Sequence, residues 1–306
     1  MPLPSVLEIL GQRLFDLQPA QAVSSAQDSI VWLIRAPRVV LGALVGAGLA
    51  LVGTALQAVT RNPLADPHLL GVSSGAALGA VIVVLYLGEF IGLLSLPLAA
   101  FVGALVSMLL VLAIASRGGR LESDRLLLAG VAVSFVMMAA SNLLLFLGDH
   151  HAASSVIFWM LGGLGLARWE LLWLPALCLM LALLLLLGLA RALNALMAGE
   201  HSAVSLGLEP RRVRLLVFVC ASLLTGVLVS LSGAIGFVGL ILPHVARFLV
   251  GAEHRRLLPV SALLGALFLV WVDVAARTLL APQDLPIGIA TAAIGGVFFV
   301  LLLRRR

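Results

Sequence analysis

Long apolar runs follow one another along this chain, separated by short polar or charged breaks. Most runs are long enough to cross about 30 Å of hydrocarbon as an α-helix. Gly42 and Gly46 form a GxxxG pair in the first run, which predicts close packing of helix backbones. The expected fold class is all-α, a polytopic helical membrane protein. Nine crossing helices are predicted, near residues 39–59, 69–87, 92–115, 126–147, 171–190, 213–231, 236–250, 259–280 and 287–303.

Two shorter elements interrupt this pattern. The apolar piece Val156–Leu166 follows a charged break and is too short to cross, which favours an external half-helix. The segment Met197–Arg214 is polar, partly helical in pattern, and lies between two apolar runs. Residues 1–34 are interrupted by charges and have no signal peptide of the usual layout, so we expect an external segment there. Residues 35–306 then form one transmembrane domain.

The composition agrees with a membrane setting. Hydrophobic residues make up 62% of the 306 residues, charged residues make up 11%, and the mean hydropathy is +1.18. Such a composition cannot supply a water-facing surface around one soluble core. The bilayer is therefore the expected solvent, and no room is left for a separate soluble enzyme domain.

The placement of arginines predicts the orientation, because loops rich in positive charge stay in the cytoplasm. The external side receives Arg13, Arg35, Arg38, Arg168 and Arg277. The C-terminus is therefore expected inside the cell. The cytoplasmic side is predicted to carry Arg61, Arg117, Arg120, Arg125, Arg191, Arg211, Arg212, Arg214, Arg247, Arg255, Arg256 and Arg304 to Arg306.

All nineteen basic residues are arginine, because the sequence contains no lysine. A Walker A loop needs a lysine that reaches the nucleotide phosphates, and a Schiff-base cofactor needs a lysine amine. We therefore expect that the chain is not an enzyme and does not itself bind a cofactor. Cys178 and Cys220 lie in apolar runs without companion ligands, so we expect neither a disulfide nor a metal site.

Five segments resemble one known family, in the correct order along residues 30–303. This family is the iron-chelate, haem and cobalamin permeases of ATP-binding-cassette importers, the FecCD-type transmembrane subunit of type II importers. Members ordinarily have ten membrane helices, so the resemblance implies that the first is absent here. The segments are RAPRVVLGALVGAGLALVGTALQAVTRNPLADPHLLGVSSGAALGA from Arg35, RLLLAGVAVS from Arg125, FWMLGGLG from Phe158, GAIGFVGLILPHVARFLVG from Gly233 and DLPIGIATAAIGG from Asp284.

The resemblance implies a permease subunit that imports an iron chelate, either a ferric siderophore or haem, across the bacterial inner membrane. Cobalamin is the alternative cargo within the family. The implied partners are a second copy of the chain, two ATP-binding-cassette ATPase subunits, a periplasmic substrate-binding protein and membrane lipid, but no nucleic acid. ATP and Mg are then bound by the ATPase subunits.

In that family, a loop of short cytoplasmic helices sits in a cleft of the ATPase subunit. The matching stretch is Met197–Leu208, with Glu200 and Gly207 at positions where the family has a Glu and a Gly. We expect this loop to be stiff and anchored against Arg211–Arg214, so that it passes on a displacement. An ordinary polar connector is the alternative. The residues assigned to ATPase coupling are Glu200, His201, Ser202, Ser205, Leu206, Gly207 and Leu208.

Arg35, Arg38 and Arg277 match family positions that pair with carboxylates of the binding protein. Arg35 and Arg38 flank a proline, and together they could engage one acidic patch through charge-assisted hydrogen bonds. Simple anchoring at the membrane interface is the alternative for these two. Asp273 precedes Arg277 by four residues on one predicted helix, so it can neutralise that arginine internally.

A cytoplasmic gate is implied where four further residues align with the family, near the inner end of the pathway. Turn formation and helix capping explain these residues almost as well. The four are Asn62, Leu64, Ser123 and Asp124.

His150 and His151 lie at the predicted external mouth. Neutral imidazole is a good iron ligand, and the neighbouring half-helix could guide a flat substrate, so the pair suggests a haem contact. Solvated loop histidines are the alternative interpretation.

Two other classes of function have less support in the sequence. An ion-coupled secondary transporter usually holds its driving ion with intramembrane carboxylates or discontinuous helices, and Asp273 offers little for this role. A membrane-embedded enzyme would need clustered histidines and acids, or a serine with a base, at membrane depth. The six histidines are scattered and mostly fall in loops.

Overall fold

The computed structural model describes residues 3–16, 24–116 and 123–304, and these form helices and loops without a strand among them. The all-α class is thereby confirmed. Six described stretches are long and apolar enough to cross a membrane, and three are shorter: Val72–Leu87, Val238–Val250 and Ile287–Leu301. The nine predicted runs correspond to α3 (Ala36–Thr60), α4 (Val72–Ile82), α5 (Ser95–Ala115), α6 (Ser123–Leu147), α8 (Trp169–Gly188), α11 (Pro210–Ser232), α12 (Val238–Val250), α13 (His254–Leu279) and α14 (Ile287–Arg304). Short helical segments adjoin some of these helices: the 3₁₀ helices η2 (Pro67–Leu70) and η4 (Gly92–Leu94), and the π-helical η3 (Val83–Leu87).

The predicted half-helix is present, but it begins earlier than expected. α7 spans His150–Met160, whereas the apolar pattern placed it at Val156–Leu166. The Asp149 carboxylate explains the early start, because it accepts a hydrogen bond from the Ala152 N–H at 3.1 Å and caps the helix. Gly162 explains the end, since its φ of +80° is a left-handed conformation in which helices stop.

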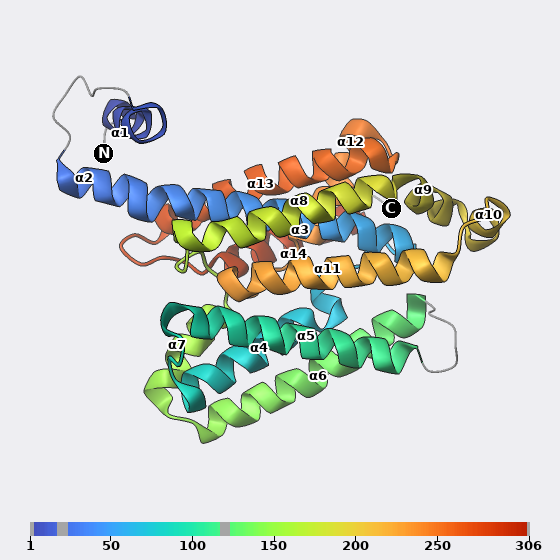
Figure 1. The fold of residues 1–306 in the computed structure, drawn as a ribbon, viewed down its shortest axis with the longest axis horizontal. Coiled ribbons are helices and arrows are strands. Elements are labelled where there is room, and N and C mark those ends of the chain that lie inside the picture. Colours follow the sequence, from blue (N-terminus) through green and yellow to red (C-terminus); the bar gives the residue numbers. More distant parts are fainter. Residues whose placement is uncertain (1–2, 17–23, 117–122, 305–306) are drawn as a thin grey trace.

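α3 runs through the interior of the bundle (Figure 1). It packs against α8, α11, α12 and α13, while α4 to α7 form a second group that joins the first mainly through the contacts of α5 and α4 with α11. In its most apolar stretch 78% of residues are buried, against 22% for α6, so α3 is interior and α6 faces outward. α2 (Ser25–Ser29) and η1 (Ile30–Arg35), a π-helical segment, continue without a break into α3. The predicted boundary between residues 34 and 35 falls inside this helix.

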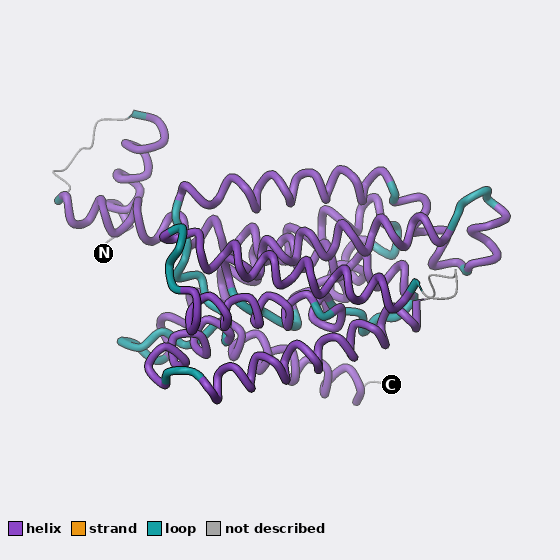
Figure 2. The backbone as a smooth tube through the Cα atoms, turned by 60° about the horizontal axis from the view of Figure 1, so that its bottom comes forward, coloured by secondary structure: helices purple, strands orange, loops and turns teal. Residues whose placement is uncertain are grey.

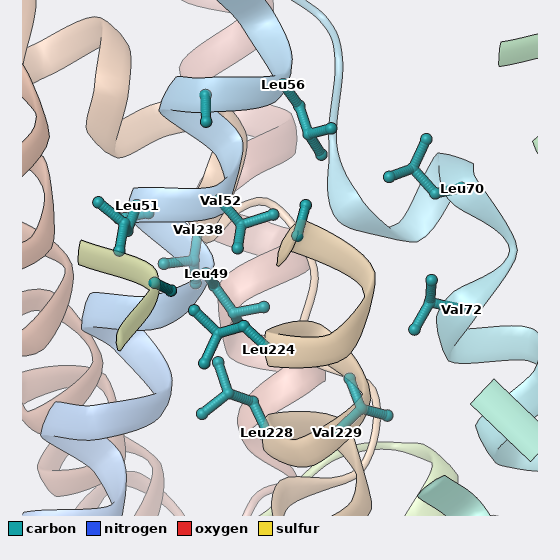
Figure 3. Packing of buried hydrophobic residues seen from close by; sticks show 14 of the residues in the cluster. Leu49, Leu51, Val52, Leu56, Leu70, Val72, Leu224, Leu228, Val229 and Val238 are labelled. Carbon is teal, nitrogen blue, oxygen red and sulfur yellow. The ribbon is translucent and has the colours of Figure 1, made fainter. Parts of the chain in front are cut away.

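Leucine side chains fill the space between α3 and α11. Figure 3 shows Leu224 and Leu228 of α11 pointing toward Leu49 of α3, and none of the three is more than 2% exposed. Because lipid tails are as apolar as leucine, the association of these helices depends on tight van der Waals packing.

Glycines bring α3 to backbone contact with two neighbours. A Cβ atom on Gly46 would lie 2.1 Å from the carbonyl oxygen of Gly265 in α13, and one on Gly53 would lie 2.1 Å from that of Gly239 in α12. Gly42, the other member of the predicted pair, faces a leucine side chain at 3.0 Å. The close approach expected from the glycine pattern is therefore made by Gly46 and Gly53.

The two ends of the long axis carry different elements (Figures 1 and 2). α9 (Ala190–Ala198), α10 (Glu200–Ser205) and the C-terminal end of α14 lie at one end, and α1 (Leu3–Phe15) and α7 lie at the other. Four arginines predicted to be cytoplasmic lie outside the described residues: Arg117, Arg120, Arg305 and Arg306. The others belong to segments that begin or end near α10: Arg61, Arg125, Arg191, Arg211, Arg212, Arg214, Arg247, Arg255, Arg256 and Arg304.

Gly46→Val should lower the free energy of unfolding by about 1–3 kcal/mol, because the added side chain forces α3 and α13 apart. The matched control is Gly296→Val in α14, where a Cβ would meet nothing within 4 Å. Thermal unfolding midpoints of the purified protein in detergent measure both effects. Equal losses in the two variants would show that the glycine contact does not limit packing.

Candidate coupling, docking and gate sites

The connection between α8 and α11 folds into two short helices punctuated by glycines. α9 ends at Gly199, whose φ of +128° turns the chain before α10 begins. Gly207 follows α10 with a φ of +75°, and Pro210 then starts α11. The residues predicted to couple to an ATPase thus form a compact unit, at the same end of the molecule as the end of α14.

An ion pair fixes α10 to α11. Arg214 donates to Glu200 twice, from Nη2 to Oε2 at 2.9 Å and from Nη1 to Oε1 at 3.3 Å. Arg214 is only 5% exposed, whereas about half of the Glu200 side chain reaches solvent. The hydrogen bond from Arg214 holds the pKa of the Glu200 carboxyl below its ordinary value, so the pair stays charged near neutral pH. An anchor within Arg211–Arg214 was expected, and the structure places it at Arg214.

A second contact fixes α9 to α13. The side-chain oxygen of Asn194 accepts a hydrogen bond from the His254 backbone N–H at 3.0 Å and lies 2.6 Å from His254 Nδ1. His254 is 2% exposed and Asn194 is half-buried, so the contact is largely shielded from water. Sequence reasoning missed this pair, because 60 residues separate its members and no motif marks either one.

Exposed apolar side chains lie on and beside α10. Val204 is 56% exposed and Leu206 71%, and Met197 at the end of α9 is 45% exposed. Ala203 of α10 is fully buried. Exposed apolar residues beside polar ones, on a loop that is held rigidly, are typical of a docking surface. The other predicted coupling residues are exposed or half-buried: His201, Ser202, Ser205, Gly207 and Leu208.

Glu200→Gln should lower the thermal unfolding midpoint of the protein at pH 7, and this difference should shrink as the pH falls. A depressed pKa means that the pair stabilises the fold above the ordinary Glu pKa of about 4.3, and that this contribution is lost as the pH falls through the depressed value. Glu209→Gln is the control, since Glu209 pairs with Arg212 at 2.6 Å on the exposed surface of the same loop. Identical pH profiles for the two variants would contradict an anchoring role for Glu200.

The opposite end carries a cluster of four charged residues. Arg38 of α3 contacts Asp273 of α13 at 2.9 Å and Asp284, in the segment before α14, at 3.0 Å. Arg277 Nε donates to the second oxygen of Asp273 at 3.0 Å, as the four-residue spacing predicted. The Asp273 side chain is 3% exposed, so two arginines neutralise a carboxylate that hardly reaches water.

This cluster changes the interpretation of the predicted docking arginines. The Arg38 side chain is 18% exposed and both of its carboxylate partners belong to this chain, while that of Arg277 is 24% exposed. Arg35 is exposed, and it forms no ion pair within the part of the chain that the structure describes. Of the three arginines, Arg35 is therefore the one most open to a partner.

Arg38→Ala should lower the free energy of unfolding by about 1–3 kcal/mol, because it removes charged hydrogen bonds from a buried carboxylate. Arg35→Ala, a change of the same type on the same helix, should cost less than about 0.5 kcal/mol. Denaturation of both variants under the same conditions tests this. A larger loss for Arg35→Ala would contradict the structural role given to Arg38.

The predicted gate residues lie near the junction of α3 and α6. Ser123, at the start of α6, donates to the Val59 carbonyl of α3 at 3.1 Å. The Asn62 side chain accepts a hydrogen bond from the Leu64 N–H at 2.9 Å and so forms a turn after α3. Leu64 is 53% exposed, and Asp124 is exposed in the first turn of α6. The turn contact expected as an alternative is thus present at Asn62, and gating stays a prediction.

His150 and His151 are the first two residues of α7. Among the described residues, no group of three or more His, Cys, Asp or Glu side chains could hold a metal ion. The haem contact at this pair stays a prediction.

A mostly apolar cavity of about 950 Å³ lies between α5, α8 and α11. Phe101, Leu174 and Leu223 are among its lining residues, and its charged lining residues are Arg168 and Glu170 at the start of α8. This lining offers few polar groups for a charged chelate, so we do not assign the cargo to it.

The family is decided by the match of nearly the whole chain. The model of the FecCD transport family covers residues 4–305. The chain belongs to the FecCD transport family. As the sequence resemblance predicted, similar FecCD proteins include the cobalamin import system permease BtuC of Halobacterium salinarum, 44% identical over 90% of this chain and 74% of the relative. The hemin transport system permease HmuU of Yersinia pestis is 42% identical over 90% and 84%, and the Fe(3+) dicitrate transport system permease FecC of Escherichia coli is 41% identical over 91% and 84%.

A solved structure shares this FecCD fold. An inward-facing conformation of a putative metal-chelate type ABC transporter superposes with a TM-score of 0.85 at 33% identity, covering 99% of this chain and 96% of the other. PsaBC from Streptococcus pneumoniae shares the fold alone, with a TM-score of 0.61 at 19% identity over 90% and 92% of the two chains.

Proposed function

We propose that this protein is the transmembrane permease subunit of an ATP-binding-cassette importer for iron chelates. The match to the FecCD family over residues 4–305 carries this proposal. A periplasmic binding protein delivers the cargo to the external end, and two separate ATPase subunits, which bind ATP and Mg, drive its passage. The chain itself is a conduit and catalyses no reaction.

The proposed setting is the bacterial inner membrane, with the α10 end and the C-terminus in the cytoplasm. The described arginines of the predicted inner side belong to segments that begin or end near α10, which supports this orientation. A second copy completes the passage in the proposed assembly.

The rigid α9–α10 unit is the proposed docking element for the ATPase. Its exposed Val204 and Leu206 supply apolar contact area, and the two anchors tie the unit to α11 through Arg214 and to α13 through His254. A displacement of α10 is therefore transmitted to two spanning helices, α11 and α13. At the other end, Arg35 is the proposed contact for acidic side chains of the binding protein.

Haem or a ferric siderophore is the proposed cargo class, since similar proteins are named for hemin and ferric dicitrate transport. Cobalamin is the alternative, for which the relative from Halobacterium salinarum is named. Ion-coupled transport is disfavoured, because Asp273, the carboxylate considered for it, is already bound by Arg38 and Arg277.

Leu206→Asp should reduce ATP-dependent uptake strongly, because it places a charge where the ATPase contacts an apolar surface. Burial of a leucine is worth roughly 1.5–3 kcal/mol, so affinity for the ATPase should fall about 10- to 100-fold. The assay uses proteoliposomes that contain the permease with its co-purified ATPase. Haemin, ferric citrate or cobalamin is added outside the vesicles in separate experiments, so that uptake and cargo choice are measured together. Arg212→Gln, on the exposed surface of the same loop, is the control.

Two outcomes would contradict the proposal. Uptake that continues without ATP but collapses with the proton gradient would favour a secondary transporter. Unchanged affinity of the Leu206→Asp variant for the ATPase would show that the ATPase does not dock on the α10 surface.

A further inference from the structure

α1 presents three different faces along one helix. Spacing at 100° per residue places Ile9, which is fully buried, opposite a face of exposed apolar residues. On that exposed face Leu7 is 59% exposed, Leu14 58% and Phe15 74%. Between the two faces runs a narrow polar strip made of Ser5, Glu8 and Gln12. One apolar face therefore packs against the protein, and the other is uncovered.

The helix lies across the direction of the membrane spans. In Figure 1, α1 is seen nearly end-on, whereas α3, α11 and α13 run along the horizontal axis. α1 is thus roughly parallel to the plane of the membrane, at the end opposite α10. Arg13, in its last turn, holds it to α2 through a pair with Asp28, with Nε and Oδ1 3.2 Å apart.

The level of α1 coincides with features of a membrane–water interface. α1 packs against η1, which contains Trp32. The Trp32 and Trp169 rings are in contact, tilted by 33° with centroids 4.8 Å apart, and Trp169 Nε1 donates to the Trp32 carbonyl at 2.8 Å. Tryptophan is enriched where hydrocarbon meets headgroups. On η1 itself, Leu33 and Ile34 are each 59% exposed, so the segment against which α1 packs also exposes apolar side chains.

We propose that α1 is an interfacial helix whose exposed apolar face lies against the outer leaflet of the bilayer. This face contacts lipid at the boundary of headgroups and acyl chains, where an amphipathic helix parallel to the membrane buries its apolar side. The polar strip with Glu8 and Gln12 faces water. The membrane surface then holds the outer end of the 36-residue helix Ser25–Thr60 through the Arg13–Asp28 pair. This assignment depends on membrane insertion and on neither the cargo nor the ATPase.

Site-specific fluorescence tests the assignment on the full chain in vesicles of phosphatidylethanolamine and phosphatidylglycerol. Cys178→Ser and Cys220→Ser remove the native thiols, and an environment-sensitive probe is then attached at Leu7→Cys, Leu14→Cys or the control Gln12→Cys. At positions 7 and 14 we expect blue-shifted emission, quenching by lipids that carry a nitroxide high on the acyl chain, and iodide quenching several-fold weaker than at position 12. The probe at position 12 should be quenched by iodide and little affected by the nitroxide lipids.

Two results would overturn the assignment. Equal iodide quenching at all three positions would place the apolar face in water. Protection from both iodide and nitroxide lipids at positions 7 and 14 would mean that protein, and not lipid, covers this face. Insertion of each variant into the membrane does not depend on transport activity. These fluorescence readouts would therefore be the same even if the protein proved not to be an importer.

Discussion

Contact between helix backbones at glycine is the interaction on which this architecture depends. In hydrocarbon, apolar side chains gain nothing by leaving lipid for protein, so the helices must gain their attraction from atoms in direct contact. Gly46 and Gly53 allow α13 and α12 to touch the backbone of α3, and leucines of α11 fill a third side. The interior position of α3 follows from these contacts, and the remaining helices are arranged around it.

Polar groups are concentrated at the two ends of this packed interior, where they join helices that are distant in sequence. Arg38 and Asp273 join α3 to α13 at one end, while Glu200 with Arg214 and Asn194 with His254 join the α9–α10 unit to α11 and α13 at the other. α13 takes part at both ends. A movement imposed on α10 therefore has a continuous, stiff route to the opposite face of the protein.

Sequence reasoning found what local composition determines. Hydrocarbon thickness sets a minimum length for an apolar run, so all nine apolar helices could be located. The α10 loop was singled out by its polar pattern between two apolar runs and by the resemblance to the family. The boundary of α7 was misplaced because Asp149 begins the helix within residues that looked like a charged break. Arg38 was assigned to contacts with a binding protein, and its carboxylate partners within the chain were not predicted, because they lie 235 and 246 residues away and no local pattern marks them. Contacts of this kind become visible only once the chain is folded.

The two anchors of the α9–α10 unit differ in chemistry, and this difference has a physical consequence. Glu200 is half exposed, so mobile ions can weaken its attraction to Arg214, whereas the Asn194–His254 contact involves a buried histidine and is made through hydrogen bonds between uncharged groups. A high salt concentration would weaken the Glu200–Arg214 contact with α11 and leave the Asn194–His254 contact with α13 intact. The unit would then be held by the Asn194–His254 contact and by its chain connections to α8 and α11. Its rigidity, but not its location, is therefore sensitive to the ionic composition of the surrounding solution.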